Sequence, residues 1–314
     1  METKKQKHIS VLLRESIDGL NIKEDGTYVD ATLGRAGHSS EILKKLSSQG
    51  MLYAFDLDKE AIEASKSKLS TISPRYELIH ANFSKIEEEL ANRNVKHVDG
   101  ILFDLGVSSP QLDNGERGFS YNKDAKLDMR MNVEQTLDAY TVVNTYTEAK
   151  LYEIISKYGE EKFAKSISRN IVKQRKEKDI ATTLELVEII KKSFPPSKLR
   201  EGHPAKRTFQ AIRIEVNDEL NNIETALRKA VNLLNKGGRI AVITFHSLED
   251  KIVKKIFKEV SEGEKWNKNM PLGLPTENKV KYQVVNKKVI LPSEEELTEN
   301  RRSHSAKLRI LEKI

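Results

Sequence analysis

The chain of 314 residues contains no cysteine, only one tryptophan and no long apolar run. The absence of cysteine excludes disulfides, thiolate metal ligands and cysteine nucleophiles. Because no apolar run is long enough to cross a bilayer and no secretory pattern opens the chain, we expect no membrane span and no export signal. Four histidines lack a carboxylate or second histidine at ligand spacing, so we expect no metal site: His80, His97, His203 and His304. These absences favour a cytoplasmic protein.

Composition limits the number of domains and the kind of partner that the protein can have. The length allows one large domain or two modest ones, and 38% hydrophobic residues can form a substantial core. Lysine and arginine number 54 against 47 acidic residues, which gives a formal net charge of +7. This surplus fits a heavily charged surface, and it also fits a polyanionic partner such as nucleic acid, since basic side chains release counterions from a phosphate backbone.

Two glycines and two acids form the most informative pattern. A β-branched run that ends in Asp30 leads into a loop with Gly34 and Gly37, and a helical pattern follows; a second apolar run ends at Asp56. This order is typical of an adenosine-containing cofactor at the carboxyl ends of a parallel sheet. Glycine lets the backbone approach a ligand, the helix start offers free N–H groups, and the second acid can accept both ribose hydroxyl protons.

The spacing in this loop argues against a dinucleotide. The dinucleotide fingerprint is G-x-G-x-x-G, whereas this chain has only Gly34-Arg-Ala-Gly37, with Thr32 where the first glycine would stand. A pyrophosphate needs the triple-glycine turn, but the smaller zwitterionic methionine end of S-adenosylmethionine does not. The carboxyl group of Asp30 could face the ammonium group of that cofactor. We therefore expect S-adenosylmethionine.

Strand and helix patterns alternate from residue 26 to 103 and resume at 237, which predicts βαβ units and a parallel sheet. Residues 113–205 carry helical patterns with little strand character. The expected fold is therefore α/β, a Rossmann-like methyltransferase sheet of residues 1–112 and 206–314 with an α-helical domain inserted at 113–205. At the carboxyl edge, the insertion would cover the cofactor and recognise the substrate. Alternatively, these helices extend the main core.

The fourth predicted strand ends in Asp104, and Ser109-Pro110 follows. The exocyclic amine of a nucleobase is a poor nucleophile because its lone pair is delocalised into the ring. Protein oxygens that accept its N–H groups favour a pyramidal nitrogen and hold it in line with a methyl sulfonium. Ser109-Pro110 resembles half of the Ser/Asn/Asp-Pro-Pro-aromatic motif of amino-methyltransferases, with Gln111 in place of the second proline. We expect Asp104 and Ser109 to orient the amine, although Asp104 equally fits a cofactor contact.

Other segments have two interpretations each. Phe83, after the third strand, could cover an adenine ring or belong to the core. His38 is a candidate cofactor neighbour, and His246 could line the acceptor cleft. The arginine and aromatic residues of 117–121, together with 127–131, could stack an unpaired base. The basic run 300–309 could hold phosphates or keep an exposed sheet edge soluble.

Seven segments in order resemble the bacterial small-subunit ribosomal RNA (cytosine-N4)-methyltransferase family, the MraW or H-type enzymes: His8–Leu13, Asp30–Ser39, Asp104–Gln111, Arg117–Ser120, Leu127–Met131, Thr244–Asp250 and Arg302–Arg309. The resemblance covers nearly the whole chain. It implies a Rossmann-like domain with a helical insertion, S-adenosylmethionine as donor and a cytidine in the decoding region of 16S rRNA as acceptor. It also implies cofactor contacts at Ala36, Gly37, His38, Asp56, Phe83, Asp104 and Gln111. Ala36 departs from the glycine that the family often has, which a negative φ would tolerate.

The resulting hypothesis is an RNA cytosine-N4 methyltransferase that acts on the small ribosomal subunit by direct in-line transfer, without a metal or a covalent intermediate. The sequence leaves a homodimer open. Two other classes fit part of the pattern: a nicotinamide oxidoreductase, against which the missing third glycine argues, and a non-catalytic RNA-binding or assembly factor.

Overall fold

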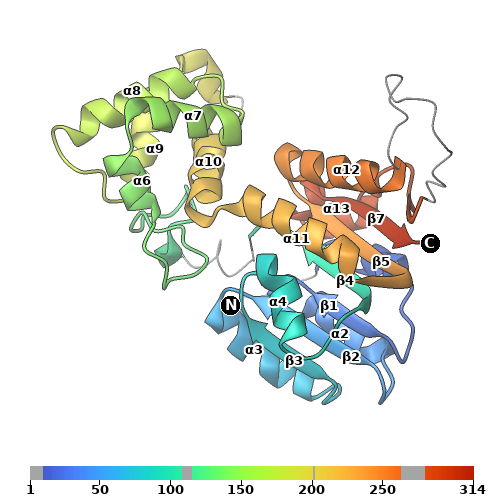
Figure 1. Cartoon of the computed structure of the whole chain (residues 1–314). Coiled ribbons are helices and arrows are strands. Elements are labelled where there is room, and N and C mark those ends of the chain that lie inside the picture. The colour runs from blue at the N-terminus through green and yellow to red at the C-terminus, as the bar shows by residue number, and fades with distance from the viewer. Residues whose placement is uncertain (1–9, 108–114, 201, 263–279) are drawn as a thin grey trace, which may run out of the picture. The chain divides into compact units, whose positions relative to one another are not determined.

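The structure is a computed structural model that describes residues 10–107, 115–200, 202–262 and 280–314. The chain forms two compact units (Figure 1). Unit 1 contains the residues up to Gly106 together with Leu220–Ile314, and unit 2 is Val107–Glu219. Among the helices of the described ranges, none combines the length and hydrophobicity that a membrane crossing requires.

Unit 1 is built on a seven-stranded sheet of order β3-β2-β1-β4-β5-β7-β6. The first five strands along the chain pair in parallel, whereas β7 is antiparallel to both β5 and β6. The strands are β1 (Thr27–Asp30), β2 (Met51–Asp56), β3 (Tyr76–His80), β4 (Val98–Asp104), β5 (Leu234–Thr244), β6 (Tyr282–Val284) and β7 (Lys307–Lys313). The α/β fold expected from the alternating patterns is confirmed.

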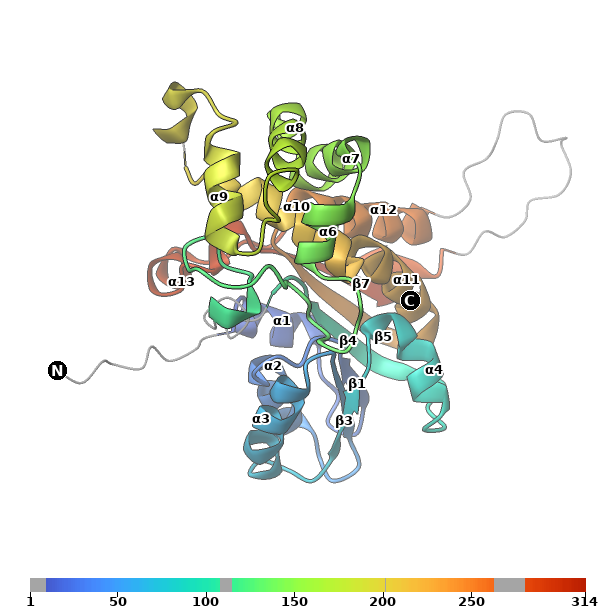
Figure 2. The same ribbon diagram turned by 90° about the vertical axis from the view of Figure 1, so that its left-hand side faces the viewer.

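Helices cover both faces of this sheet, which explains why its central strands are apolar on both sides. One face packs against α4 (Ile86–Ala91), α11 (Glu219–Leu233) and α12 (Ser247–Glu262). The other packs against α1 (Leu13–Leu20), α2 (Gly37–Lys45) and α3 (Lys59–Ser70); Figure 2 shows α2 beside α3. Adjacent residues of β1 divide between the two cores, with Val29 in one and Tyr28 in the other. The described part of the unit also has three short helices: η1 (Phe83–Lys85), α13 (Glu294–Glu299) and η4 (Ser303–Ser305).

Unit 2 is helical and has a hydrophobic core of its own. Its helices are η2 (Gly115–Arg117), α6 (Ala139–Thr145), α7 (Glu148–Gly159), α8 (Ala164–Arg175), α9 (Thr183–Lys191), η3 (Pro196–Arg200) and α10 (Ala205–Asn217). The border between the units follows Gly106 and Glu219, whereas the sequence placed it after residues 112 and 205. The second border differs because α10 belongs to unit 2: its apolar stripe of Phe209, Ile212 and Val216 packs into the core of that unit.

Candidate active site

Three acids end neighbouring strands at one edge of the sheet. Asp30 ends β1, Asp56 ends β2 and Asp104 ends β4, and β1 lies between the other two strands. Because Asp30 pairs in register with Ala54 of β2 and Leu102 of β4, both neighbours continue two residues past the end of β1. The chain leaves β1 toward β2 on one side and meets β4 on the other, which is the switch point where open α/β sheets bind ligands.

The loop after β1 fills the space between the longer strands. The Ala31 N–H donates to the Leu102 carbonyl, and the Leu33 N–H donates to the Phe55 carbonyl, both at 2.8 Å. The Thr32 hydroxyl accepts from the Asp104 N–H at 2.7 Å. The glycine loop is thus fixed to β2 and β4 before any ligand is considered.

Asp56 is held in place by backbone donors on both sides. Its Oδ2 accepts from the Gly34 N–H and its Oδ1 from the Asp58 N–H, each at 2.9 Å. Gly34 has φ +50°, in the left-handed region that suits glycine. Burial raises the pKa of Asp56 to about 6, and the two hydrogen bonds oppose that rise. Each carboxylate oxygen has two lone pairs, so Asp56 can still accept from a pair of ribose hydroxyls.

The start of α2 differs from the expectation in one respect. Ala36 has φ +53° and precedes the helix as its N-cap residue, so the condition of a negative φ, under which its methyl group would be tolerated, is not met. A Cβ at Gly37 would overlap the Ser10 hydroxyl, so a larger residue at this position would have to displace that side chain. The loop therefore has a strained residue next to one that allows close approach of the N-terminal segment.

Asp30 anchors the loop through two hydrogen bonds. Its side chain is buried, its Oδ2 accepts from the Ser39 hydroxyl at 2.6 Å, and its Oδ1 accepts from the Thr32 N–H at 3.1 Å. The expected contact between this carboxyl group and the ammonium of the cofactor stays a prediction.

Asp104, which is half-buried, and the buried His38 lie side by side next to the loop. His38 Nε2 lies 3.2 Å from the Val11 carbonyl, and Nδ1 lies 3.6 Å from Asp104 Oδ2. A carbonyl oxygen only accepts, so His38 presents its Nε2–H to Val11 and turns Nδ1 toward Asp104. Burial raises the pKa of Asp104 well above its usual value, and the charges of Asp30, Glu249 and Glu296 add to the rise.

The Oδ1 atom of Asp104 is the observation that points to a ligand. This atom is buried and has no hydrogen-bond partner within the described ranges. A buried polar atom without a partner is costly, and native structures rarely keep one without a functional reason. Its place at the switch point, beside the glycine loop, fits the polar groups of S-adenosylmethionine or of its acceptor.

The structure describes the remaining predicted residues in part. Phe83 is half-buried at the end of β3 and packs edge-to-face on Phe103, with 5.9 Å between ring centroids. This position fits both the core and the adenine interpretation. Ser109 and Gln111 lie outside the described residues.

Sequence reasoning missed three polar residues that support the loop. Besides Thr32, Ser65 donates to the Gly34 carbonyl at 3.1 Å, and Lys68 Nζ donates to the Arg35 and Ala36 carbonyls at 3.2 and 3.1 Å. Ser65 and Lys68 lie on α3, more than thirty residues from the carbonyls they contact. No local pattern marks a residue for such a contact.

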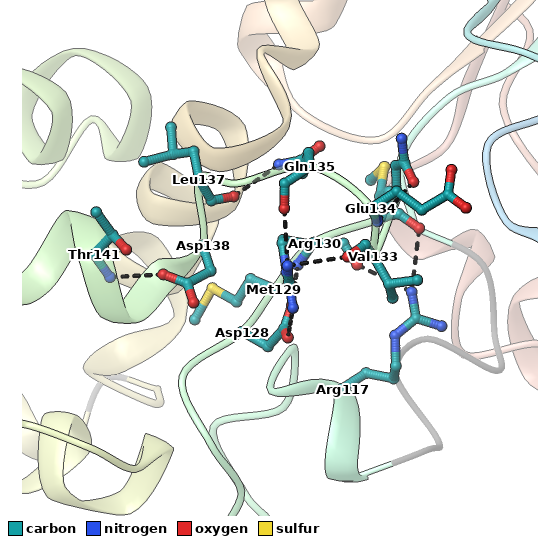
Figure 3. Close-up of polar contacts among 12 residues, drawn as sticks. Arg117, Asp128, Met129, Arg130, Val133, Glu134, Gln135, Leu137, Asp138 and Thr141 are labelled. Atoms are coloured by element: carbon teal, nitrogen blue, oxygen red, sulfur yellow. Dashed lines mark hydrogen bonds and ion pairs between the residues drawn. The ribbon is translucent and has the colours of Figure 1, made fainter.

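The arginines of the predicted base-stacking loop are used inside unit 2. Arg130 binds both oxygens of Asp128, at 2.9 and 2.7 Å, and donates to the Val133 and Gln135 carbonyls (Figure 3). Arg117 donates to the carbonyls of Arg130 and Met131. These guanidinium groups hold the loop together.

Its aromatic rings are used in the same way. Phe119 is buried, and Tyr121 stacks on His203 with 4.3 Å between ring centroids. In the terminal basic run, Arg309 pairs with both oxygens of Asp250 at 2.7 and 3.3 Å. His246 Nε2 lies 3.1 Å from Glu249 Oε1. Phe119, Tyr121 and Arg309 therefore have intramolecular partners.

Comparisons with known proteins show the family of the chain. The profile of the MraW methylase family matches residues 5–314. The protein named ribosomal RNA small subunit methyltransferase H from Mycoplasma mycoides subsp. mycoides SC is 55% identical over 310 residues, which cover 98% of this chain and 99% of that protein. Its namesake from Clostridium botulinum is 55% identical over 311 residues, with coverage of 98% and 99%. The namesake from Oceanobacillus iheyensis is 52% identical over 308 residues, with coverage of 98% and 94%.

Among solved structures, an rRNA methylase from Streptococcus thermophilus aligns with a TM-score of 0.45 at 13% identity, covering 98% of this chain and 99% of that one. The family match and the identities above 50% show the relationship without this structural likeness. The chain belongs to the MraW methylase family, and it is a methyltransferase that uses S-adenosylmethionine as its methyl donor.

Proposed function

We propose that this enzyme methylates the N4 amine of a cytidine in the decoding region of 16S rRNA, in the small ribosomal subunit of the cytoplasm. The relatives named ribosomal RNA small subunit methyltransferase H support the substrate class, and so does the net charge of +7. The observation that carries the proposal is the buried, partnerless Oδ1 of Asp104 at the carboxyl end of β4.

Each cofactor residue is assigned to one part of the methyl donor. S-adenosylmethionine, when bound, supplies a methyl group on a sulfonium that needs no further activation. Asp56 accepts from the ribose hydroxyls, because its carboxylate is already aligned by two backbone donors. The segment Ala36–His38 approaches the methionine end. Phe83 covers the adenine ring with the part of its face that the core leaves exposed, and Gln111 completes the set by family resemblance.

The acceptor side rests on Asp104 and Ser109. Asp104 Oδ1 accepts an N–H of the cytosine amine, which keeps the nitrogen lone pair directed at the methyl group. In the transfer the N–C bond would form as the S–C bond of the sulfonium breaks, and S-adenosylhomocysteine would leave. The raised pKa of Asp104 makes its carboxylate basic enough to take the proton that the amine loses. Ser109 accepts from the second N–H of the amine.

The test uses tritiated S-adenosylmethionine and small ribosomal subunits from cells that lack the enzyme. We expect label in 16S rRNA, recovered as N4-methylcytidine after digestion and mass analysis. Asp104→Asn should abolish transfer, whereas Asp99→Asn, at the other end of the same strand, should retain it. Label on carbon 5 of cytosine, or on another nucleotide, would make the acceptor assignment wrong.

Binding of S-adenosylhomocysteine by calorimetry separates the two roles open to Asp104. If Asp104→Asn binds the product normally and fails only in transfer, the residue acts on the acceptor amine. If binding is lost together with transfer, Asp104 contacts the cofactor, and the proposed acceptor role is wrong.

A further inference from the structure

Helix α8 of unit 2 carries an uninterrupted line of positive charge. All four ionisable residues of the helix are cationic, and lysines stand just before and just after it. Five of these side chains are exposed, and together they are called the α8 stripe: Lys162, Lys165, Arg169, Lys173 and Lys176.

The spacing places the stripe on one face of the helix. From Lys165 to Lys176 successive members differ by three or four residues, so at 3.6 residues per turn these four fall within about 80° of arc, whereas Lys162 lies in the turn before the helix. The stretch from Lys165 to Lys176 is about 16 Å long at 1.5 Å per residue. Ile167 and Ile171 lie on the opposite face and pack into the core of unit 2. The cations therefore point away from the packed side of the helix.

The stripe has no acidic counterpart. Exposed lysines nearby pair with acids, such as Lys178 with Glu185 at 2.7 Å and Lys191 with Glu188 at 2.8 Å. No member of the stripe forms an ion pair with any residue that the structure describes. Like charges at i, i+4 repel each other, so the arrangement costs helix stability. Lys173 alone of the four helical or C-cap members lies in the last turn, where the helix dipole favours a cation.

One arginine of α8 has a structural role and so differs from the members of the α8 stripe. Arg175 is half-buried and donates to the Val143 and Tyr146 carbonyls at 2.7 and 2.6 Å. Arg117, Arg130 and the terminal Arg309 are likewise used inside the fold. The stripe remains as cationic surface without such an internal role.

We propose that the α8 stripe docks the phosphate backbone of the RNA substrate. This inference rests on the proposed function, because it takes ribosomal RNA as the substrate. A row of flexible ammonium groups suits phosphates, whose contacts position a protein without reading sequence. The stripe would therefore supply affinity and register, while the choice of nucleotide is made at the sheet edge of unit 1.

The decisive variant removes three charges, Lys165→Gln, Arg169→Gln and Lys173→Gln. The matched control also removes three exposed charges, Lys254→Gln, Lys255→Gln and Lys258→Gln on α12. Each phosphate contact to a single strand contributes about 0.7 to the slope of log affinity against log salt, so the α8 variant should lower that slope by about 2. At about 0.15 M salt the same relation predicts affinity about 50-fold weaker.

The readouts are filter binding of small ribosomal subunits across a salt series, together with KM and kcat for methylation. The α8 variant should raise KM with little change in kcat and should bind S-adenosylhomocysteine normally, whereas the α12 control should follow the wild type. The pair Lys165→Arg and Lys173→Arg should retain affinity, since it keeps the charge. An α8 variant that binds subunits as tightly as the α12 control, or that loses affinity only for anionic lipid vesicles, overturns the inference. Failure of the wild type to methylate ribosomal RNA would instead overturn the proposed function.

Discussion

The affinity for the cofactor should depend on pH through Asp56, and the raised pKa of this residue determines the direction of the change. Its pKa in the folded protein is about 6, because burial outweighs the hydrogen bonds from Gly34 and Asp58. A pKa raised above the unfolded value of 3.8 stabilises the fold fully below pH 3.8, and this contribution is lost as the pH rises through about 6. Ribose hydroxyls, by contrast, need the ionised form as their acceptor. The stability of the free enzyme and its affinity for cofactor should therefore change in opposite directions with pH.

The magnitudes follow from this pKa. With a value of about 6, roughly 97% of Asp56 is ionised at pH 7.5 and roughly 9% at pH 5. Affinity for S-adenosylhomocysteine should therefore fall about tenfold between these pH values. The ionised group lowers the free energy of unfolding of the ligand-free protein by at most about 3 kcal/mol, at 1.36 kcal/mol per pKa unit. Asp56→Asn should weaken binding at pH 7.5 by about 10- to 150-fold, since hydrogen bonds to a charged group contribute about 1.5–3 kcal/mol.

Calorimetric titration with S-adenosylhomocysteine at several pH values measures how its affinity depends on pH. Urea unfolding of the free protein measures the opposite change in the free energy of unfolding. The difference between wild type and Asp56→Asn isolates this residue from Asp30 and Asp104, whose pKa values are also raised. Asp58→Asn is the matched control, because asparagine caps α3 as well as aspartate does and leaves Asp56 in place. Wild-type affinity that is constant from pH 5 to 7.5, or an Asp56→Asn variant that keeps the tenfold change, would refute the reasoning.

Two further predictions concern single substitutions. Asp104→Asn should raise the Tm at pH 8, because it removes a buried carboxylate whose stabilising protonated form is lost as the pH rises through its raised pKa; the gain should shrink toward pH 4 in thermal scans. The same variant should lose about 100-fold or more in methyl transfer, and a wild-type rate would contradict the role of this residue. Gly118→Ala should lower the free energy of unfolding by more than about 2 kcal/mol in urea, because φ is +72° and the new Cβ would lie 2.5 Å from the Lys126 carbonyl oxygen. Gly202→Ala, with φ +118° and nothing within 4 Å, should cost less, and equal losses would argue against the overlap.

The parallel sheet was predictable because its signals are local. Strands buried on both faces are apolar runs, and the glycine loop with Asp56 marks the cofactor edge by spacing alone. Asp30, Asp56 and Asp104 could be placed together because the carboxyl ends of parallel strands meet at one edge. The border of the insertion was not predictable, since the apolar stripe of α10 shows that the helix packs but not which core it joins.

The roles of individual polar groups depended on the tertiary structure. The sequence could not show that Asp30 is enclosed by Ser39 and Thr32, or that Lys68 contacts carbonyls more than thirty residues away. Nor could it separate Arg309, which pairs with Asp250, from the exposed cations of α8.

Residue order alone was sufficient for the fold class, the family and the methyl donor, because periodicity, glycine spacing and matching motifs are written along the chain. Only the folded chain decided which charged groups are already paired, because hydrogen bonds and ion pairs form between residues that are close in space and distant in sequence. The partnerless oxygen of Asp104 and the unpaired cations of α8 belong to this second kind of information, and the two proposals rest on them.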